Sequence, residues 1–305
     1  MKKIILSIVL TLAISLSAMA EIKRSPNRMG NQLTVTFDCP WNVLCKEAIR
    51  YSPSCPDLDV KLDVYYPKNF KSPDYKPVPC LLMIHGGGWS MGNEKKFAMF
   101  AAYAASRGYV VACISYRLLP EFELEDCIED CWLALKWLKQ NAASFGGNPG
   151  KIGVIGGSAG GHLTAMLATA QESQICKKVF ADGTDPSIQA AVPMAPVTDL
   201  YSSAKRFSRV FKDAPDAKER AKEASPVSYV SAKSAPMHIL HSRGDKTVPI
   251  SESENLQKKY KEFKLECPIT YYDSSNHAFW NTHPIGAERM QSWTDAIDIF
   301  DKILK

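Results

Sequence analysis

The sequence predicts an α/β fold in which helices cover both faces of a mostly parallel β-sheet. Two observations lead to this prediction. Short, continuous apolar runs recur along the chain, and segments with helical spacing of apolar residues separate them. A strand buried on both faces needs an unbroken apolar run, and strand–helix alternation is typical of a parallel sheet because each crossover runs through a helix.

The expected strands fall into two groups. The first group alternates apolar and polar residues, as half-exposed antiparallel strands do, and comprises residues 33–37 and 58–65. The second group consists of continuous apolar runs, which predict strands buried on both faces at residues 80–84, 109–114, 152–155, 190–194, 237–240 and 269–272.

The expected helices lie between and after these buried strands. In residues 123–143, Leu124, Ile128, Leu135 and Leu138 recur at helical spacing. The predicted helices cover residues 94–107, 123–143, 163–170, 252–263 and 287–304.

A polar, Lys-rich stretch at residues 199–234 interrupts the alternation. Because so long a connection is uncommon in a compact domain, we expect it to fold over the sheet edge as a lid; an ordinary surface insertion is the alternative. The chain is therefore expected to have an N-terminal arm at residues 21–57 and one catalytic α/β domain at residues 58–305.

Residues 1–20 match a secretory signal peptide. Lys2 and Lys3 precede an apolar run at residues 4–16, and Ala18 and Ala20 are small residues where a signal peptidase cleaves. The apolar run is shorter than the ~20 residues that span a bilayer, and no later stretch is apolar enough to do so. The mature chain is expected to be exported to the periplasm or the extracellular space, without a membrane span.

The charges and the cysteines exclude several classes of partner. The net charge is +5, and the charged residues are interspersed, so neither nucleic acid nor an anionic surface is predicted as a partner. The nine cysteines match no compact zinc motif. In an oxidising compartment a disulfide could tether the N-terminal arm, which contains Cys39, Cys45 and Cys55. Others lie in apolar patterns and are expected in the core, namely Cys80, Cys113, Cys127 and Cys131.

The sharpest local signal is Gly-Gly-Ser-Ala-Gly-Gly at residues 156–161. It follows the buried-strand pattern of residues 151–155 and precedes a helical pattern, which is the context of a nucleophile elbow carrying Ser158. A glycine-rich turn before a helix could instead bind phosphate, but no Gly-Lys-Ser/Thr follows it here. The sequence therefore favours Ser158 as a nucleophile.

A second glycine-rich signal, His-Gly-Gly-Gly-Trp at residues 85–89, follows the first buried strand. Consecutive glycines let the backbone approach a ligand and direct N–H groups toward it. We expect the amides of Gly87 and Gly88, together with that of Ala159, to form an oxyanion hole. His85 is expected to pack the loop.

The general base and its acid are expected later in the chain. Asp245 follows the strand at residues 237–240 and His277 follows the last strand, so both lie at the carboxyl edge of the sheet. The order Ser158, Asp245, His277 is the one that a nucleophile elbow of this kind uses. Asp199 also follows a strand and is the rival acid. The remaining histidines are expected to be structural: His162 behind the elbow, His238 in a strand, and His241 and His283 in loops.

The combination of motifs resembles the α/β-hydrolase esterases of the hormone-sensitive-lipase-like group. The resemblance extends from about residue 58 to the C-terminus and includes Tyr-Arg-Leu-Leu-Pro-Glu at residues 116–121. It implies an α/β-hydrolase fold, no cofactor, and the triad and oxyanion donors named above. Asp-Val-Tyr-Tyr-Pro at residues 63–67 and the short lid look most like bacterial acetyl-xylan and feruloyl esterases, which implies a small-molecule or carbohydrate ester as substrate.

Four other functions are weighed against this one. A serine peptidase of the prolyl-oligopeptidase kind shares the elbow but carries a propeller domain, for which the chain has no repeat signal. An amide hydrolase such as a formamidase also uses a glycine-rich loop, and a lipase-like esterase would act on small acyl esters. A non-catalytic binding module is disfavoured because all three triad candidates are present.

Overall fold

A computed structural model describes residues 20–23, 34–37, 40–52, 60–202, 210–211, 214–281 and 287–305. The predicted signal peptide lies almost wholly outside the described residues, as do Cys39, Cys55 and His283. The suggested disulfide in the arm therefore stays a prediction. In the described part of the chain, no helix combines the length and apolar composition needed to cross a membrane.

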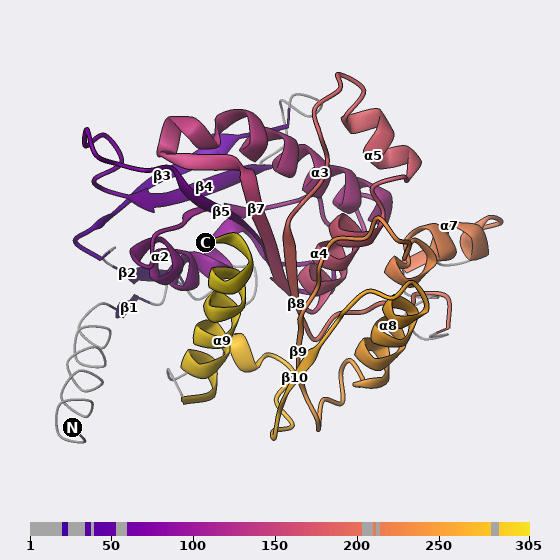
Figure 1. Ribbon diagram of the computed structural model, residues 1–305. Coiled ribbons are helices and arrows are strands. Elements are labelled where there is room, and N and C mark those ends of the chain that lie inside the picture. Colours follow the sequence, from indigo (N-terminus) through magenta and orange to yellow (C-terminus); the bar gives the residue numbers. More distant parts are fainter. Residues whose placement is uncertain are drawn as a thin grey trace.

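An eight-stranded sheet forms the centre of the molecule, in the order β10-β9-β8-β7-β5-β6-β4-β3 (Figure 1). Strands β5 to β10 are parallel to their neighbours among themselves, and β4 and β3 complete one edge in antiparallel pairing. The strands are β3 (Val43–Arg50), β4 (Lys61–Pro67), β5 (Val78–Ile84), β6 (Val110–Ile114), β7 (Gly147–Gly157), β8 (Ala190–Met194), β9 (Ile239–Ser242) and β10 (Ile269–Tyr272).

The predicted parallel strands are confirmed, but β10 lies at the edge of the sheet and is only partly buried, and the first part of the sheet also differs from the prediction. The strand predicted at residues 33–37 is β2 (Thr34–Phe37), which pairs with β1 (Ala20–Lys23) in a separate two-stranded sheet. Strand β3 was not expected, because charged residues and a register shift between Lys46 and Ile49 obscure its pattern. It begins before residue 58, so the arm contributes an edge strand to the main sheet.

Strand β4 is mostly buried, and the expectation that it is half exposed was wrong. Its one acidic residue, Asp63, is compatible with burial because Lys95 Nζ lies 2.7 Å from Asp63 Oδ2 and the Ala48 amide donates to Asp63 Oδ1 at 2.9 Å. A buried charge that is paired in this way gives the sequence the same alternation of apolar and polar residues as a half-exposed strand.

Helices cover both faces of the sheet, as predicted (Figure 1). One apolar cluster packs under α3, α4 and α8, and the other packs under α2 and α9. The helices are α2 (Ala98–Ser106), α3 (Leu124–Asn141), α4 (Ala159–Thr169), α5 (Gln174–Val179), α7 (Ala217–Glu223), α8 (Ser251–Glu262) and α9 (Ala287–Leu304). Short 3₁₀ turns are η1 (Glu94–Phe97), η2 (Ala142–Phe145), η3 (Pro226–Ser228) and η4 (Phe279–Asn281).

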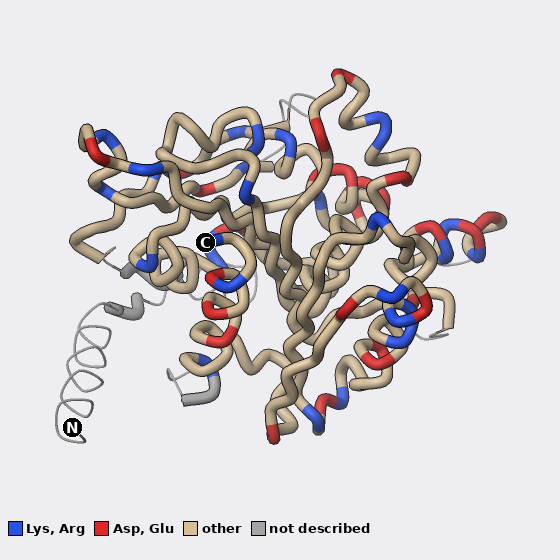
Figure 2. Tube along the Cα trace, in the orientation of Figure 1, with Lys and Arg blue, Asp and Glu red and all other residues tan. Residues whose placement is uncertain are grey.

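The charged residues lie mainly on the outer elements. Figure 2 shows both signs interleaved on α7 and α8, whereas the central strands carry few charges. This distribution matches the apolar sequence of the strands between β5 and β10, whose side chains pack beneath the helices.

The described part of the predicted insertion packs against the main domain. Its helix α7 is tied to the start of α3, because Arg220 lies 2.7 Å from both Glu123 Oε2 and Glu125 Oε1. The Ala224 carbonyl, at the end of α7, accepts a hydrogen bond from His162 Nε2 at 2.7 Å. The role of residues 199–234 as a lid stays a prediction.

Burial of His162 predicts a pH-dependent stability. Burial lowers the pKa of His162 to about 4, against the opposing effect of the bond to Ala224. Unfolded His162 titrates near 6.5, so between these two values only the unfolded state binds the proton. The free energy of unfolding should therefore fall as the pH drops from about 6.5 toward 4, and His162 alone should contribute roughly 3 kcal/mol of this fall.

Urea denaturation at about pH 7 and about pH 4.5 measures this effect. The control is His162→Gln, whose amide nitrogen can still donate to Ala224 but does not titrate. We expect the difference between the two pH values to be smaller in this variant than in the native protein. His85, the buried histidine of the glycine loop, is present in both proteins and does not affect the comparison. Equal pH dependence would contradict the prediction.

Candidate active site

The three predicted triad residues meet at the carboxyl edge of the parallel strands. Ser158 follows β7, Asp245 follows β9 and His277 follows β10. His277 Nε2 lies 2.8 Å from Ser158 Oγ, and His277 Nδ1 lies 2.6 Å from Asp245 Oδ2. A carboxylate only accepts hydrogen bonds, so His277 Nδ1 carries the proton and Nε2 accepts from the Ser158 hydroxyl. The structure thus joins the three side chains in one hydrogen-bonded series.

Ser158 lies on a strained turn between β7 and α4. Its φ of 56° and ψ of −117° are unusual for a residue with a side chain. The Ser158 amide donates to the Met194 carbonyl on β8 at 2.8 Å, and its carbonyl accepts from the His162 amide at 2.9 Å. The turn is therefore fixed by the neighbouring strand and by the first turn of α4.

The glycines around Ser158 are required because the backbones touch. A Cβ at Gly156 would lie 2.4 Å from the Gly160 carbonyl oxygen, and a Cβ at Gly160 would lie 2.1 Å from the Ile84 carbonyl oxygen. Real Cβ atoms do not approach so closely, so any side chain at either position would separate β5, β7 and α4.

The Asp245 carboxylate is buried and held by several donors. Its Oδ1 accepts from the Thr247 amide at 2.8 Å and from the Val248 amide at 3.0 Å. Burial alone would raise the pKa of Asp245, but the contact with His241 and the hydrogen bonds from His277 and Val248 outweigh burial and hold the pKa well below its usual range. Asp245 is therefore ionised whenever the protein is near neutral pH.

The rival acid, Asp199, has a different role. Its Oδ1 accepts from the amides of Tyr201 at 2.9 Å and Ser202 at 3.1 Å. This is a local turn at the start of the insertion. The structure brings Asp245, rather than Asp199, to His277.

The glycine loop at residues 85–89 passes directly over the elbow. A Cβ at Gly86 would lie 2.5 Å from the Gly157 carbonyl oxygen and 3.4 Å from Ser158 Cβ. Gly87 and Gly88 have φ values of 134° and 59°, which glycine adopts readily. Ala159 is the first residue of α4, and the first amides of a helix have no partner within it. The glycine loop and the N-terminus of α4, which carry the three predicted oxyanion donors, therefore border the nucleophile.

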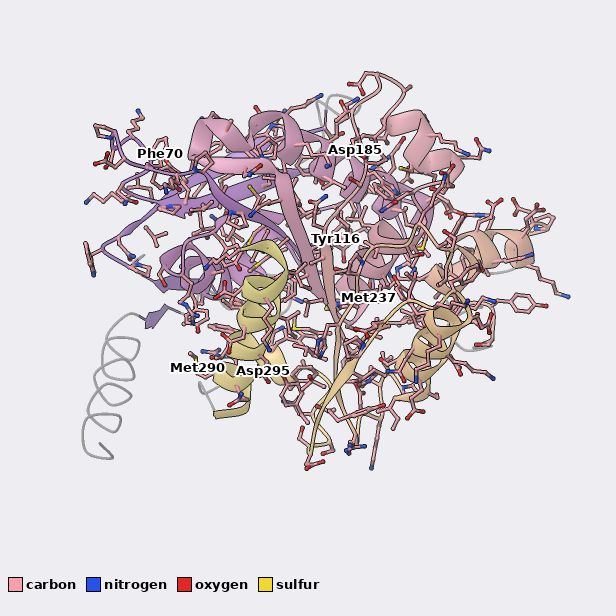
Figure 3. All side chains as sticks on the ribbon, in the orientation of Figure 1. Phe70, Tyr116, Asp185, Met237, Met290 and Asp295 are labelled. Carbon is pink, nitrogen blue, oxygen red and sulfur yellow. The ribbon has the colours of Figure 1, made fainter. Side chains whose placement is uncertain are left out.

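Tyr116 supports the glycine loop at residues 85–89. Its hydroxyl donates to the His85 carbonyl at 3.0 Å, and its ring stacks on the buried His85 ring with 4.2 Å between centroids. Figure 3 places Tyr116 at the centre of the molecule, whereas Phe70 and Asp185 lie toward the periphery. His85 thus has the packing position that the sequence predicts.

The arginine that follows Tyr116 is buried in an acidic cluster. Arg117 Nε donates to Asp130 Oδ2 at 3.0 Å, and its other nitrogens lie 2.6 Å from Asp126 Oδ1 and 2.8 Å from Glu129 Oε2. All three acids belong to α3. The Tyr-Arg-Leu-Leu-Pro-Glu motif therefore fixes the segment that holds the glycine loop.

Trp89, at the end of the glycine loop, contacts the helix that carries the elbow. Its Nε1 donates to His162 Nδ1 at 3.2 Å, while His162 Nε2 donates to the Ala224 carbonyl. His162 is fully buried behind the elbow, as predicted, and also joins the glycine loop to the insertion.

Two residues near the site were not singled out by the sequence. His241 lies in β9, not in a loop, and is fully buried with its Nε2 3.4 Å from Asp245 Oδ2. Its four-residue separation from Asp245 was the available signal. Trp280 packs behind the elbow, since a Cβ at Gly157 would lie 2.3 Å from its ring.

Among the described residues, no group of three or more His, Cys, Asp or Glu side chains could hold a metal ion.

The chain is similar to proteins that are named as ester hydrolases. It shares 30% identity over 214 residues with the probable carboxylic ester hydrolase LipM of Mycobacterium tuberculosis, covering 66% of this chain and 49% of LipM. Esterase LipQ of the same organism is 28% identical over 225 residues, covering 69% of this chain and 53% of LipQ. The chain thus spans about half the length of these two relatives.

Solved structures show the same fold over nearly their whole length. The apo form of Thermogutta terrifontis esterase 2 aligns with a TM-score of 0.70 at 26% identity, covering 86% of this chain and 94% of that one. The form phosphorylated by paraoxon aligns with a TM-score of 0.70 at 25% identity, covering 87% and 94%. Residues 62–260 match the BD-FAE family model. The chain has the α/β-hydrolase fold and belongs to the BD-FAE family.

Proposed function

We propose that the protein is a serine carboxylesterase, which hydrolyses short-chain or carbohydrate-linked esters through an acyl-enzyme. The observation that carries this proposal is the series Ser158–His277–Asp245, with separations of 2.8 and 2.6 Å, beside a glycine loop and a helix N-terminus. The family and the esterase names of the relatives support an ester as the substrate class.

In the first step, Ser158 Oγ attacks the ester carbonyl while His277 Nε2 accepts the hydroxyl proton. The carbonyl π bond breaks as the new C–O bond forms, which leaves a negative oxygen on a tetrahedral carbon. The ionised Asp245 keeps the His277 ring in the required tautomer and stabilises its charged form.

The amides of Gly87, Gly88 and Ala159 hold the negative oxygen. Loss of one such donor typically costs ~10²–10³ in rate, because the donors are already oriented before the charge develops. When the intermediate collapses, the alcohol oxygen leaves with the proton from His277, and the acyl group remains on Ser158. Water then repeats the attack with His277 as base, which releases the acid and restores Ser158.

Replacement of the nucleophile tests this proposal. Ser158→Ala should lower kcat for p-nitrophenyl acetate by about 10⁴–10⁶-fold, with the thermal transition nearly unchanged, because only the attacking oxygen is removed. Paraoxon serves as a second probe, since a related esterase is phosphorylated by it. Mass spectrometry should place the phosphoryl adduct on Ser158 in the native protein only. Substantial turnover by the variant would exclude Ser158 as the nucleophile.

A matched pair of substitutions tests the acid. Asp245→Asn should lower kcat by roughly 10⁴-fold, because an amide at this position favours the wrong His277 tautomer. Asp199→Asn should change kcat by less than about tenfold, since Asp199 supports only a local turn. Steady-state kinetics on one aryl acetate compares the two, and the reverse order of effects would reassign the acid.

The finer specificity is proposed from the resemblance to acetyl-xylan and feruloyl esterases. The Asp-Val-Tyr-Tyr-Pro segment at residues 63–67 lies on β4, between β6 and the edge strand β3. A panel of short and long acyl esters, a feruloyl ester, acetylated xylan and an aryl formamide should give the highest kcat/KM with a short-acyl or carbohydrate-linked ester. Highest activity on the formamide would favour an amide hydrolase, and preference for long acyl chains would favour a lipase-like esterase.

A further inference from the structure

We infer that His241 is a positioning residue of the proposed esterase: its ring lies beside the Asp245 carboxylate, holds the turn that carries it, and thereby tunes His277 as a base. The inference rests on the proposed function, because a base needs tuning only if His277 removes a proton from Ser158. It is carried by a second, fully buried imidazole next to the same carboxylate oxygen.

Both ring nitrogens of His241 are engaged. Nε2 lies 2.9 Å from the Val248 carbonyl oxygen, and Nδ1 lies 2.6 Å from Ser253 Oγ on α8. A carbonyl oxygen only accepts, so Nε2 carries the proton and Nδ1 accepts from the Ser253 hydroxyl. The Nε2–H of the ring is therefore directed at the turn that contains Asp245.

His241 acts on the Asp245 carboxylate in two ways. Its Nε2 lies 3.4 Å from Asp245 Oδ2, the oxygen that accepts from His277 at 2.6 Å. It also holds Val248 through its carbonyl, and the Val248 amide donates to Asp245 Oδ1 at 3.0 Å. Removal of the ring would therefore weaken the donors on both carboxylate oxygens.

The number of donors to the Asp245 carboxylate affects the proton affinity of His277. Donors on a carboxylate disperse its negative charge, so a carboxylate with fewer donors attracts a proton on its remaining partner more strongly. The contact with His241 is among the interactions that hold the pKa of Asp245 low. Loss of His241 should therefore raise the proton affinity of His277, the remaining donor to Asp245 Oδ2.

Other charged groups around this cluster have their own partners or are exposed. Glu252, next to Ser253, accepts from the Thr198 amide at 2.8 Å. Arg243 Nε lies 3.2 Å from Asp273 Oδ1 at the exposed end of the strands. Lys246 is exposed on the turn itself. These groups remain in every variant below, so they contribute equally to the comparison.

A matched pair of variants tests the inference through the pH dependence of kcat/KM for p-nitrophenyl acetate. The acid limb of this profile reports protonation of the free-enzyme base. His241→Asn places its short amide near Ser253 and leaves no donor at Asp245, so the limb should move to higher pH by roughly half a unit to one unit. His241→Gln can place an amide N–H where Nε2 lies and should keep the limb at its native position.

Ser253→Ala provides a second route if His241→Asn does not fold. It removes the hydroxyl that fixes the ring tautomer and should move the limb in the same direction by a smaller amount. If the acid limb of the kcat/KM profile keeps its native position in every variant that folds, the inference is overturned. A lower plateau with an unmoved limb would likewise show a purely structural role.

A readout without turnover separates this inference from the proposed function. The short His277 Nδ1–H bond to Asp245 should give a downfield proton resonance in the NMR spectrum. In a Ser158→Ala background, His241→Asn should shift this resonance and His241→Gln should shift it less; an unshifted resonance would overturn the inference. Absence of ester hydrolysis by the native protein would instead refute the proposed function, whatever the resonance shows.

Discussion

The turn that carries Ser158 exists only because three stretches of backbone lie in direct contact. Gly156 and Gly160 allow β7, β5 and the first turn of α4 to approach within distances that no Cβ would permit. This contact forces Ser158 into its strained conformation at the N-terminus of α4. The other groups of the site are arranged around this turn.

The glycine loop depends on the same close packing. Gly86 lies against the Gly157 carbonyl, so the loop can descend onto the nucleophile only where neither residue has a side chain. Tyr116 then holds it through the His85 carbonyl, and Trp89 holds it through His162. Polar groups buried in this way rigidify a structure when each has a partner. Preorganised amides are what stabilisation of a developing oxyanion requires.

The sequence predicted the parallel strands and the residues at their carboxyl ends, because each lies at the boundary of a short, continuous apolar run. Strand β3 was missed because its polar residues face solvent and its pairing shifts at a bulge. Strand β4 was predicted as half exposed, because its sequence does not reveal that Lys95 pairs with Asp63. The place of His241 beside Asp245 depends on how the turn to Val248 folds back, and spacing alone does not reveal it.

The bond between His162 and the Ala224 carbonyl has a consequence for the evolution of this chain. The same imidazole holds the glycine loop through Trp89, so the end of α7 and the glycine loop share one support. The length of the chain before α7 could vary without disturbing the bond to His162. A shift of the chain by one residue at position 224 would remove that bond. In a chimaera with another member of the family, a junction before α7 would therefore leave the contact between His162 and position 224 intact.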